Sequence, residues 1–331
     1  MQKLAVIIAL LVATALSALF ALKVGAVTIS WSQLFLALSG ASADALWHQI
    51  IWELRLPRVA VAFMAGAGLA LSGAMLQTVT RNPLADPYLF GISSGAALGV
   101  VAAITLFGVT SGLALSGSAF AGAMLATALL LGVTVSLRYM QSAIMVLCGV
   151  ALSFGFSALS SLLLYFSDPQ AISAVVFWSM GSFARAQLNM LLPLALLMLV
   201  ALALVFVFRR HLSALLLGDE SAHTLGVNVK ALRLFVLILS ALITAVLVSI
   251  CGGIGFVGLM IPHLVRLSGY FNSTQLYPIS FILGGLFMMW VDVIARITLP
   301  NQELPIGVIT ASIGSVFFFS LLYLRQRNQQ G

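Results

Sequence analysis

An all-α integral membrane protein is predicted by three features of this 331-residue sequence. Hydrophobic residues make up 62% of the chain, charged residues make up only 7%, and the hydrophobic residues come in long unbroken runs. A soluble domain carries about 25% charged residues and could not cover so much apolar side chain. Strands of a membrane barrel would alternate apolar and polar residues. The composition therefore excludes a nucleic-acid-binding module, a secreted disulfide scaffold and a disordered tail.

Ten apolar segments follow one another along a single predicted domain, residues 1–331. A spanning helix takes about 20 residues. The first segment follows Lys3 and is longer than the apolar core of a signal peptide, about 7–15 residues, so we expect an uncleaved first span. The eighth is short and begins in a glycine-rich stretch. The segments lie at about 4–26, 58–78, 88–108, 114–137, 142–166, 190–208, 232–251, 254–269, 277–298 and 306–324.

The distribution of lysine and arginine predicts the orientation. Ten spans place both termini on the same side, and with that side inside, ten of the 15 basic residues are inner and five are outer. Inner loops of membrane proteins carry the excess of basic residues. The sequence therefore predicts a bilayer-embedded chain with its N- and C-termini inside.

Two connections are longer than the rest. The outer one, residues 167–189, contains an aromatic stretch at Phe177-Trp178 and is expected to hold a helix at the surface. The inner one, about 209–231, is the most polar part of the chain and holds Asp219 and Glu220, two of only eight acidic residues. This loop is either a docking surface for a cytoplasmic partner or an ordinary solvated connector.

Two short motifs resemble catalytic or cofactor signatures without their required context. Gly253-Ile-Gly255-Phe-Val-Gly258 matches a dinucleotide fingerprint but joins two apolar segments, whereas the fingerprint needs a preceding strand and an acid about 20 residues on. Gly91-Ile-Ser93-Ser94-Gly95 matches a nucleophile elbow, but no pattern ties a histidine and an acid to Ser93. Glycines that allow close helix packing explain both motifs better. No catalytic, cofactor or metal site is therefore expected.

The charges inside the apolar segments are few. Asp292 and Arg296 stand four residues apart in the ninth segment, the spacing of an ion pair along a helix. An ion-coupled transporter generally needs acids near the middle of the membrane, and their scarcity disfavours that class. Arg55, Arg58 and Arg296 are expected at the outer surface, where they either meet carboxylates of a soluble partner or lie at the lipid interface.

A series of motifs along nearly the whole chain resembles the FecCD family, the permeases of ABC importers for iron chelates, haem and vitamin B12. No single motif is decisive, but their order and spacing together are specific. They are Arg55-Leu-Pro57-Arg58, Gly66-Ala-Gly68, Ser72-Gly73-Ala-Met-Leu-Gln77, Asn82-Pro83-Leu84-Ala-Asp86-Pro87, Gly91-Ile-Ser-Ser-Gly95, Leu217-Gly218-Asp219-Glu220, Leu225-Gly226, Gly255-Phe-Val-Gly258-Leu-Met-Ile-Pro262-His263 and Glu303-Leu-Pro305-Ile-Gly307-Val-Ile-Thr310.

The resemblance implies a type II importer permease with ten spans that pairs with a second permease copy, expected to be identical. It implies two cytoplasmic ATPase subunits, which bind the ATP and Mg²⁺, and a periplasmic or surface-anchored substrate-binding protein. The chain itself would hold no cofactor and would not be an enzyme. It would lie in the bacterial inner membrane and work by alternating access.

The resemblance also implies roles for individual residues. The residues that would receive the binding protein's glutamates are Arg55, Arg58 and Arg296. The residues that would dock on the ATPase are Gly218, Asp219, Glu220 and Gly226. The residues near the inner gate would be Asn82, Leu84, Gln141 and Ser142. Ala143 departs from the small polar residue that the family carries beside Ser142.

The cargo stays open at this point. An iron–siderophore complex is preferred, and vitamin B12 or haem is the alternative within the same class. An ion-coupled secondary transporter and an intramembrane enzyme built on Ser93 are the alternatives from other classes.

Overall fold

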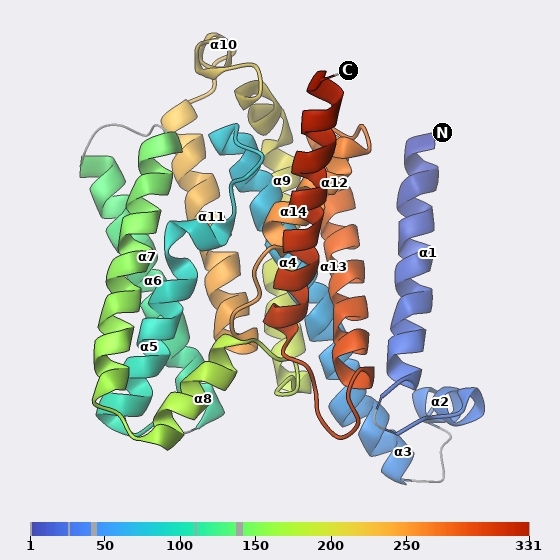
Figure 1. The fold of residues 1–331 in the computed structure, drawn as a ribbon. Helices are drawn as coiled ribbons and strands as arrows, with labels where there is room; N and C mark the ends of the chain where they lie inside the picture. The colour runs from blue at the N-terminus through green and yellow to red at the C-terminus, as the bar shows by residue number, and fades with distance from the viewer. Residues whose placement is uncertain (1, 26, 41–44, 110, 137–141, 331) are drawn as a thin grey trace.

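Helices are the only regular secondary structure in the described residues, apart from one isolated bridge between Leu299 and Gln302. The computed structural model describes residues 2–25, 27–40, 45–109, 111–136 and 142–330 (Figure 1). The helices are α1 (Gln2–Lys23), α2 (Trp31–Leu38), α3 (Ala45–Gln49), α4 (Leu56–Thr80), α5 (Ile92–Phe107), α6 (Gly112–Ser136), α7 (Ser142–Tyr165), α8 (Pro169–Ser179), α9 (Leu188–Leu215), α10 (Asp219–Thr224), α11 (Val229–Cys251), α12 (Val257–Leu267), α13 (Ser273–Ile297) and α14 (Ile306–Gln330).

Eight helical stretches among the described residues are long and apolar enough to cross a membrane. The third and eighth expected segments are shorter apolar helices, α5 with 16 residues and α12 with 11. A straight helix needs about 20 residues to cross a bilayer. Neither α5 nor α12 is long enough alone, so each would cross only together with the non-helical residues next to it. The ten-span topology with both termini inside stays a prediction.

Two boundaries differ from the sequence-based expectation. The second span begins at Ala45 rather than residue 58, because the π-helical stretch Ile50–Arg55 continues α3 directly into α4. The polar inner loop does not begin at residue 209, because α9 continues to Leu215 and leaves only residues 216–228 between α9 and α11. The expected surface helix in the outer loop is confirmed as α8.

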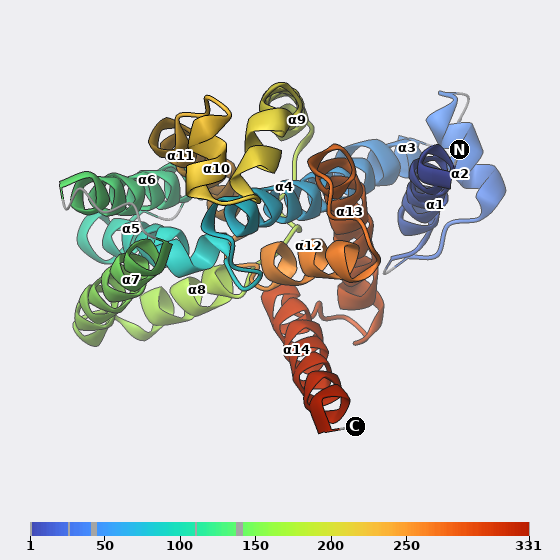
Figure 2. The ribbon, with the colours of Figure 1, turned by 90° about the horizontal axis from the view of Figure 1, so that it is seen from above.

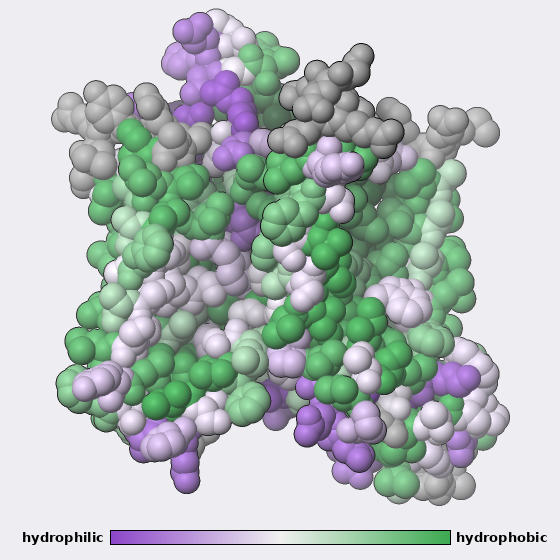
Figure 3. Space-filling model, in the orientation of Figure 1, coloured by the Kyte–Doolittle hydropathy of each residue, from purple (hydrophilic) through white to green (hydrophobic). Residues whose placement is uncertain are grey.

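The two ends of the molecule differ in what they carry. Figure 1 places the start of α1, the end of α14 and the short helix α10 at one end, with α2, α3 and α8 at the other. Between the ends, the visible surface is largely hydrophobic, and hydrophilic residues gather at the two edges (Figure 3). This is the surface expected of a chain that sits across a bilayer.

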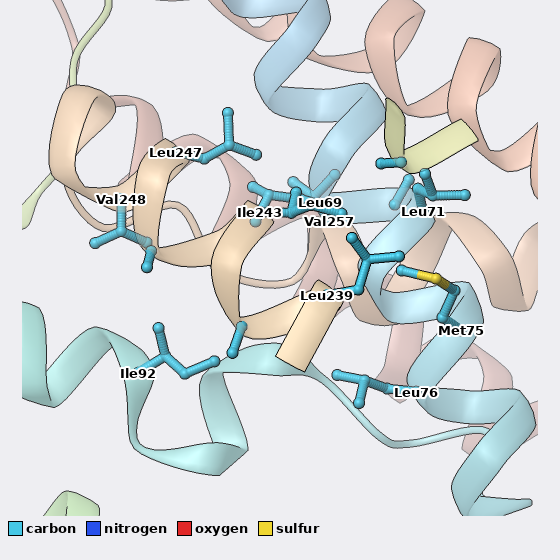
Figure 4. Packing of buried hydrophobic residues seen from close by; sticks show 14 of the residues in the cluster. Leu69, Leu71, Met75, Leu76, Ile92, Leu239, Ile243, Leu247, Val248 and Val257 are labelled. Carbon is cyan, nitrogen blue, oxygen red and sulfur yellow. The ribbon is translucent and has the colours of Figure 1, made fainter. Parts of the chain in front are cut away.

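Helix α4 runs through the centre of the bundle, against α9, α11, α12 and α13 (Figure 2). Its Leu69 and Met75 lie near the side chains of Ile243 and Leu239 on α11 (Figure 4). Lipid tails are as apolar as leucine, so packing of helices in a bilayer depends on close contact rather than on a hydrophobic driving force.

Close contact is achieved where glycines face backbone. A Cβ built on Gly73 of α4 would lie 1.8 Å from the carbonyl oxygen of Gly258 on α12. A Cβ on Gly122 of α6 would lie 2.1 Å from the carbonyl oxygen of Gly95 on α5. One glycine of each catalytic-looking motif, Gly258 and Gly95, therefore packs two helices together, as predicted from the sequence, whereas a Cβ on Gly255 would meet nothing within 4 Å.

Candidate functional site

Arg55 ends the π-helical stretch, and its guanidinium reaches the end of α1. Nη1 donates to the carbonyl oxygens of Leu22 and Lys23, each at 2.7 Å, and Nη2 donates to that of Val27. The last carbonyls of a helix have no partner within the helix, so Arg55 satisfies the end of α1. The residue is only 7% exposed, and its guanidinium faces protein rather than solvent.

Arg58 joins α4 to α13 and to the turn before α14. Its Nε donates to Oδ1 of Asp292 at 2.8 Å, while Nη1 and Nη2 donate to the two carboxylate oxygens of Glu303 at 2.6 and 2.9 Å. A two-pronged contact of this kind is the strong form of an arginine–carboxylate pair. Asp292 is 1% exposed and Glu303 is 44% exposed.

Arg296 completes the cluster from the next turn of α13. Its Nη2 lies 3.1 Å from Oδ2 of Asp292, which confirms the ion pair expected from the four-residue spacing. Its Nη1 also donates to the carbonyl oxygens of Ala21 and Val24 at 3.2 and 2.9 Å. Arg296 therefore holds the end of α1 together with Arg55.

The structure thus brings the three predicted outer arginines together at one end of the molecule. We call Arg55, Arg58, Arg296, Asp292 and Glu303 the outer charge cluster. Three arginines and two acids give it a formal charge of +1. Asp292 is buried between two arginines. A buried carboxylate needs such partners, because an unpaired buried charge strongly destabilises a protein. The bond between Arg58 and Glu303 was not predictable from the sequence, because 245 residues separate the two.

The opposite end carries α10, which stands beyond the helices α9 and α11 (Figure 1). Gly218 begins the turn with a φ of 108°, in the region that favours glycine. Asp219, the first residue of α10, accepts hydrogen bonds from Arg81 at 2.9 Å and from Arg233 at 3.0 Å. These contacts tie α10 to the end of α4 and the start of α11.

The surface beside α10 is apolar and exposed. Leu217 is 68% exposed and Leu225 is 64% exposed, and Glu220 lies exposed between them in sequence. Gly226 follows with a φ of 80° and reverses the chain toward α11. Exposed apolar patches of this kind are typical of surfaces that contact another protein.

The structure describes only some of the residues expected near the inner gate. The Oδ1 of Asn82 accepts a hydrogen bond from the backbone N–H of Leu84 at 2.9 Å, and Leu84 is exposed. Gln141 lies outside the described residues. Ser142 is the first residue of α7, and its side chain is not among the described ones.

The connection between α4 and α5 contains polar contacts that the sequence did not predict. Tyr88 Oη accepts a hydrogen bond from the backbone N–H of Ile254 at 2.7 Å, in the non-helical turn between α11 and α12. Asp86 accepts from the backbone N–H of Tyr88 at 2.8 Å and is also bonded by that of Leu259. Burial raises the pKa of Asp86 to about 6, against the lowering effect of these two bonds.

Two cavities open beside α8, at the end opposite α10. The larger, about 440 Å³, lies between the end of α8, the end of α11 and the turn 299–306. The smaller, about 350 Å³, lies between α8 and the facing ends of α5 and α6. Trp178 and Arg185 line both cavities.

The sequence profile of the FecCD transport family matches residues 10–324. The chain belongs to the FecCD transport family.

Relatives and a solved structure agree with the FecCD assignment over nearly the whole chain. The chain is 37% identical to the hemin transport system permease protein HmuU of Yersinia pestis over 326 residues, 97% of this chain and 96% of that protein. It is 39% identical to the vitamin B12 import system permease protein BtuC of Klebsiella pneumoniae over 291 residues, 88% of this chain and 87% of that protein. A structure of a metal-chelate type ABC transporter in an inward-facing conformation matches with a TM-score of 0.85 and 36% identity, over 96% of this chain and 98% of that one.

Proposed function

We propose that this FecCD-family chain is the membrane-spanning subunit of an ATP-driven importer. The observation that carries the proposal is α10, which projects from the end of the molecule that holds the start of α1 and presents exposed Leu217 and Leu225 beside the carboxylate of Asp219, which Arg81 holds. Two separate cytoplasmic subunits would bind ATP and Mg²⁺ and dock here through Gly218, Asp219, Glu220 and Gly226. Their closure would move α9 and α11, to which α10 is joined, and so open the chain alternately to each side.

At the outer end, the outer charge cluster is proposed to receive a substrate-binding protein. Arg58 already holds one exposed carboxylate, that of Glu303, through both Nη atoms. A glutamate of the partner can take the place of Glu303 without any change in the buried pair with Asp292. Arg55 and Arg296 would act by holding α1 beside this surface and by adding positive charge, because their own donors face backbone carbonyls.

A second permease copy is the proposed membrane partner. Helix α14 stands apart from the bundle in Figure 2, and both it and α7 expose large apolar residues along their length, including Phe319 at 74% and Phe154 at 74%. Two copies would enclose a path between them, with the inner gate near Asn82, Leu84, Gln141 and Ser142. The complex would lie in a bacterial inner membrane with both termini of the chain inside.

The proposed cargo is a bulky metal chelate, with an iron–siderophore complex preferred. Relatives named for hemin and for vitamin B12 support a metal-containing compound as the class of cargo. Haem and vitamin B12 are the alternatives within that class.

The decisive test is uptake by proteoliposomes that hold the chain with its ATPase subunits and binding protein. We expect uptake of the cargo to require ATP hydrolysis and to continue when ionophores remove all ion gradients. Uptake that needs a proton or sodium gradient and proceeds without the ATPase would contradict the proposal and favour the ion-coupled transporter. Replacing Ser93 by Ala should leave uptake unchanged, since the chain performs no covalent chemistry.

A further inference from the structure

Arg185 is the basic residue shared by the two cavities beside α8. It is exposed, it lines both the larger and the smaller cavity, and it has no hydrogen bond or ion pair with the described part of the chain. The other arginines at this end, Arg55, Arg58 and Arg296, are all bonded within the protein. Arg185 therefore offers a guanidinium whose donors are available to a ligand.

Neither of the acids that line these cavities forms an ion pair with Arg185. Glu303, at the larger cavity, accepts from both Nη atoms of Arg58. Asp168, at the smaller cavity, accepts a hydrogen bond from the backbone N–H of Ala171 at 2.8 Å and begins α8. A positive charge in a hollow with low-dielectric walls raises the local concentration of anions. The charge of Arg185 therefore favours an anionic ligand at the larger cavity, where the Glu303 carboxylate is already paired with Arg58. At the smaller cavity, Asp168 keeps its own negative charge.

Aromatic surface lies beside this charge. Trp178 lines both cavities together with Arg185, and Phe177, which is 69% exposed, lines the larger one. At about 440 Å³, the larger cavity falls within the range of small-molecule sites, about 300–1,000 Å³. The combination suits a ligand that is flat and apolar on one part and negatively charged on another.

We propose that Arg185 and Trp178 form an entry subsite for anionic cargo, in which a carboxylate or another oxyanion meets Arg185 while an apolar part lies against Trp178. This rests on the importer function proposed above and adds the charge of the cargo to it. An arginine fork matches a carboxylate with two parallel hydrogen bonds. The subsite favours metal chelates with an acidic periphery over cobalamins, whose periphery consists mainly of amides.

The test is equilibrium binding to the full chain in lipid nanodiscs, with three probes: ferric citrate, iron protoporphyrin IX and cyanocobalamin. Arg185→Gln should weaken binding of the two acidic probes by about tenfold, the loss expected for one charge-assisted contact. Arg185→Lys should restore most of the binding, because it keeps the charge. Arg210→Gln, an exposed arginine at the inner end of α9, is the matched control and should change nothing.

Three results would overturn the subsite: no binding of either acidic probe to the unmodified chain, an unchanged affinity for these probes in Arg185→Gln, or an equal loss for cyanocobalamin. Each leaves the importer function standing, because that function is tested separately by ATP-driven uptake. Conversely, Arg185-dependent binding of the acidic probes without ATP-driven uptake would remove the importer assignment and leave the anion subsite.

Discussion

Glu303 accepts a hydrogen bond from each Nη atom of Arg58, although 245 residues separate the two in sequence. Among the outer arginines of the described residues, Arg58 has an exposed carboxylate partner, Glu303, while Asp292 holds the buried side of the same guanidinium. In the docking proposed above, Glu303 would stand where a glutamate of the partner binds, and docking would exchange one carboxylate on Arg58 for another.

Replacing Glu303 by Gln should tighten docking of the binding protein. Exposed ion pairs contribute about 0.2–1 kcal/mol, so removing the competitor should lower the dissociation constant by up to about fivefold. The measurement is a binding titration on nanodiscs at two salt concentrations. Glu53→Gln, an exposed acid in the π-helical stretch, is the control. Weaker docking in Glu303→Gln would show that Glu303 helps to receive the partner.

Replacing Asp292 by Asn should destabilise the chain far more than replacing Glu303 by Gln. Asp292 is buried between Arg58 and Arg296, and breaking a buried pair by removing one partner costs about 3–5 kcal/mol. Thermal unfolding in detergent gives the comparison directly. Equal unfolding temperatures for the two variants would mean that the buried carboxylate does not stabilise the cluster.

Changes at α10 should separate ATP hydrolysis from transport. Leu225→Glu places a charge on an exposed apolar surface, and Glu220→Lys reverses a charge beside it. Both should leave the fold intact and reduce cargo moved per ATP severalfold, because neither side chain is buried in this chain. Assembly with the ATPase and the ratio of uptake to hydrolysis are the two readouts. Full coupling in both variants would move the docking surface elsewhere.

Two glycines of α6 make a matched pair for helix packing. Gly122→Ala would put a Cβ 2.1 Å from the carbonyl oxygen of Gly95, whereas Gly117→Ala meets nothing within 4 Å. Alanine favours a helix by about 1 kcal/mol over glycine, so Gly117→Ala should be neutral or stabilising. Gly122→Ala should cost about 1–3 kcal/mol or more by overpacking. Thermal unfolding of both variants tests this, and similar behaviour would refute the close contact between α5 and α6.

Asp86 should make stability depend on pH. Its pKa is raised from 3.8 to about 6 in the folded chain, so the folded state binds the proton more tightly than the unfolded state does. The stability from that proton is complete below pH 3.8 and is lost as pH rises through 6, a change on the order of 3 kcal/mol. Asp86→Asn should flatten this part of the pH profile. A wild-type profile that matches the variant's would contradict the assignment.

The helical membrane fold was predictable because long apolar runs leave the backbone no alternative to a helix in lipid. The end of α9 was not predictable, because basic residues do not end a helix when their side chains fold back on it. Arg209 shows this: its Nη1 donates to the carbonyl oxygen of Phe206 at 3.2 Å, and its guanidinium lies over that ring.

Part of the candidate site was also predictable from the sequence, and part was not. The gathering of Arg55, Arg58 and Arg296 followed from their shared outer position, and the pair of Asp292 with Arg296 followed from helix spacing. The bond between Tyr88 and Ile254 joins residues 166 positions apart and carries no local signal. Contacts of that kind form only when the helices are packed together, so no local pattern in the sequence predicts them.

The capping of α1 sets an order of events during synthesis. The carbonyl oxygens at the end of this helix are bonded by Arg55 and by Arg296. Arg55 leaves the ribosome soon after α1, but Arg296 is made about 270 residues after the end of α1. During synthesis, α1 can therefore form its contacts with Arg55 early, but its contacts with Arg296 form only when nearly the whole chain has been made. We expect the complete attachment of α1 to be one of the last steps of assembly.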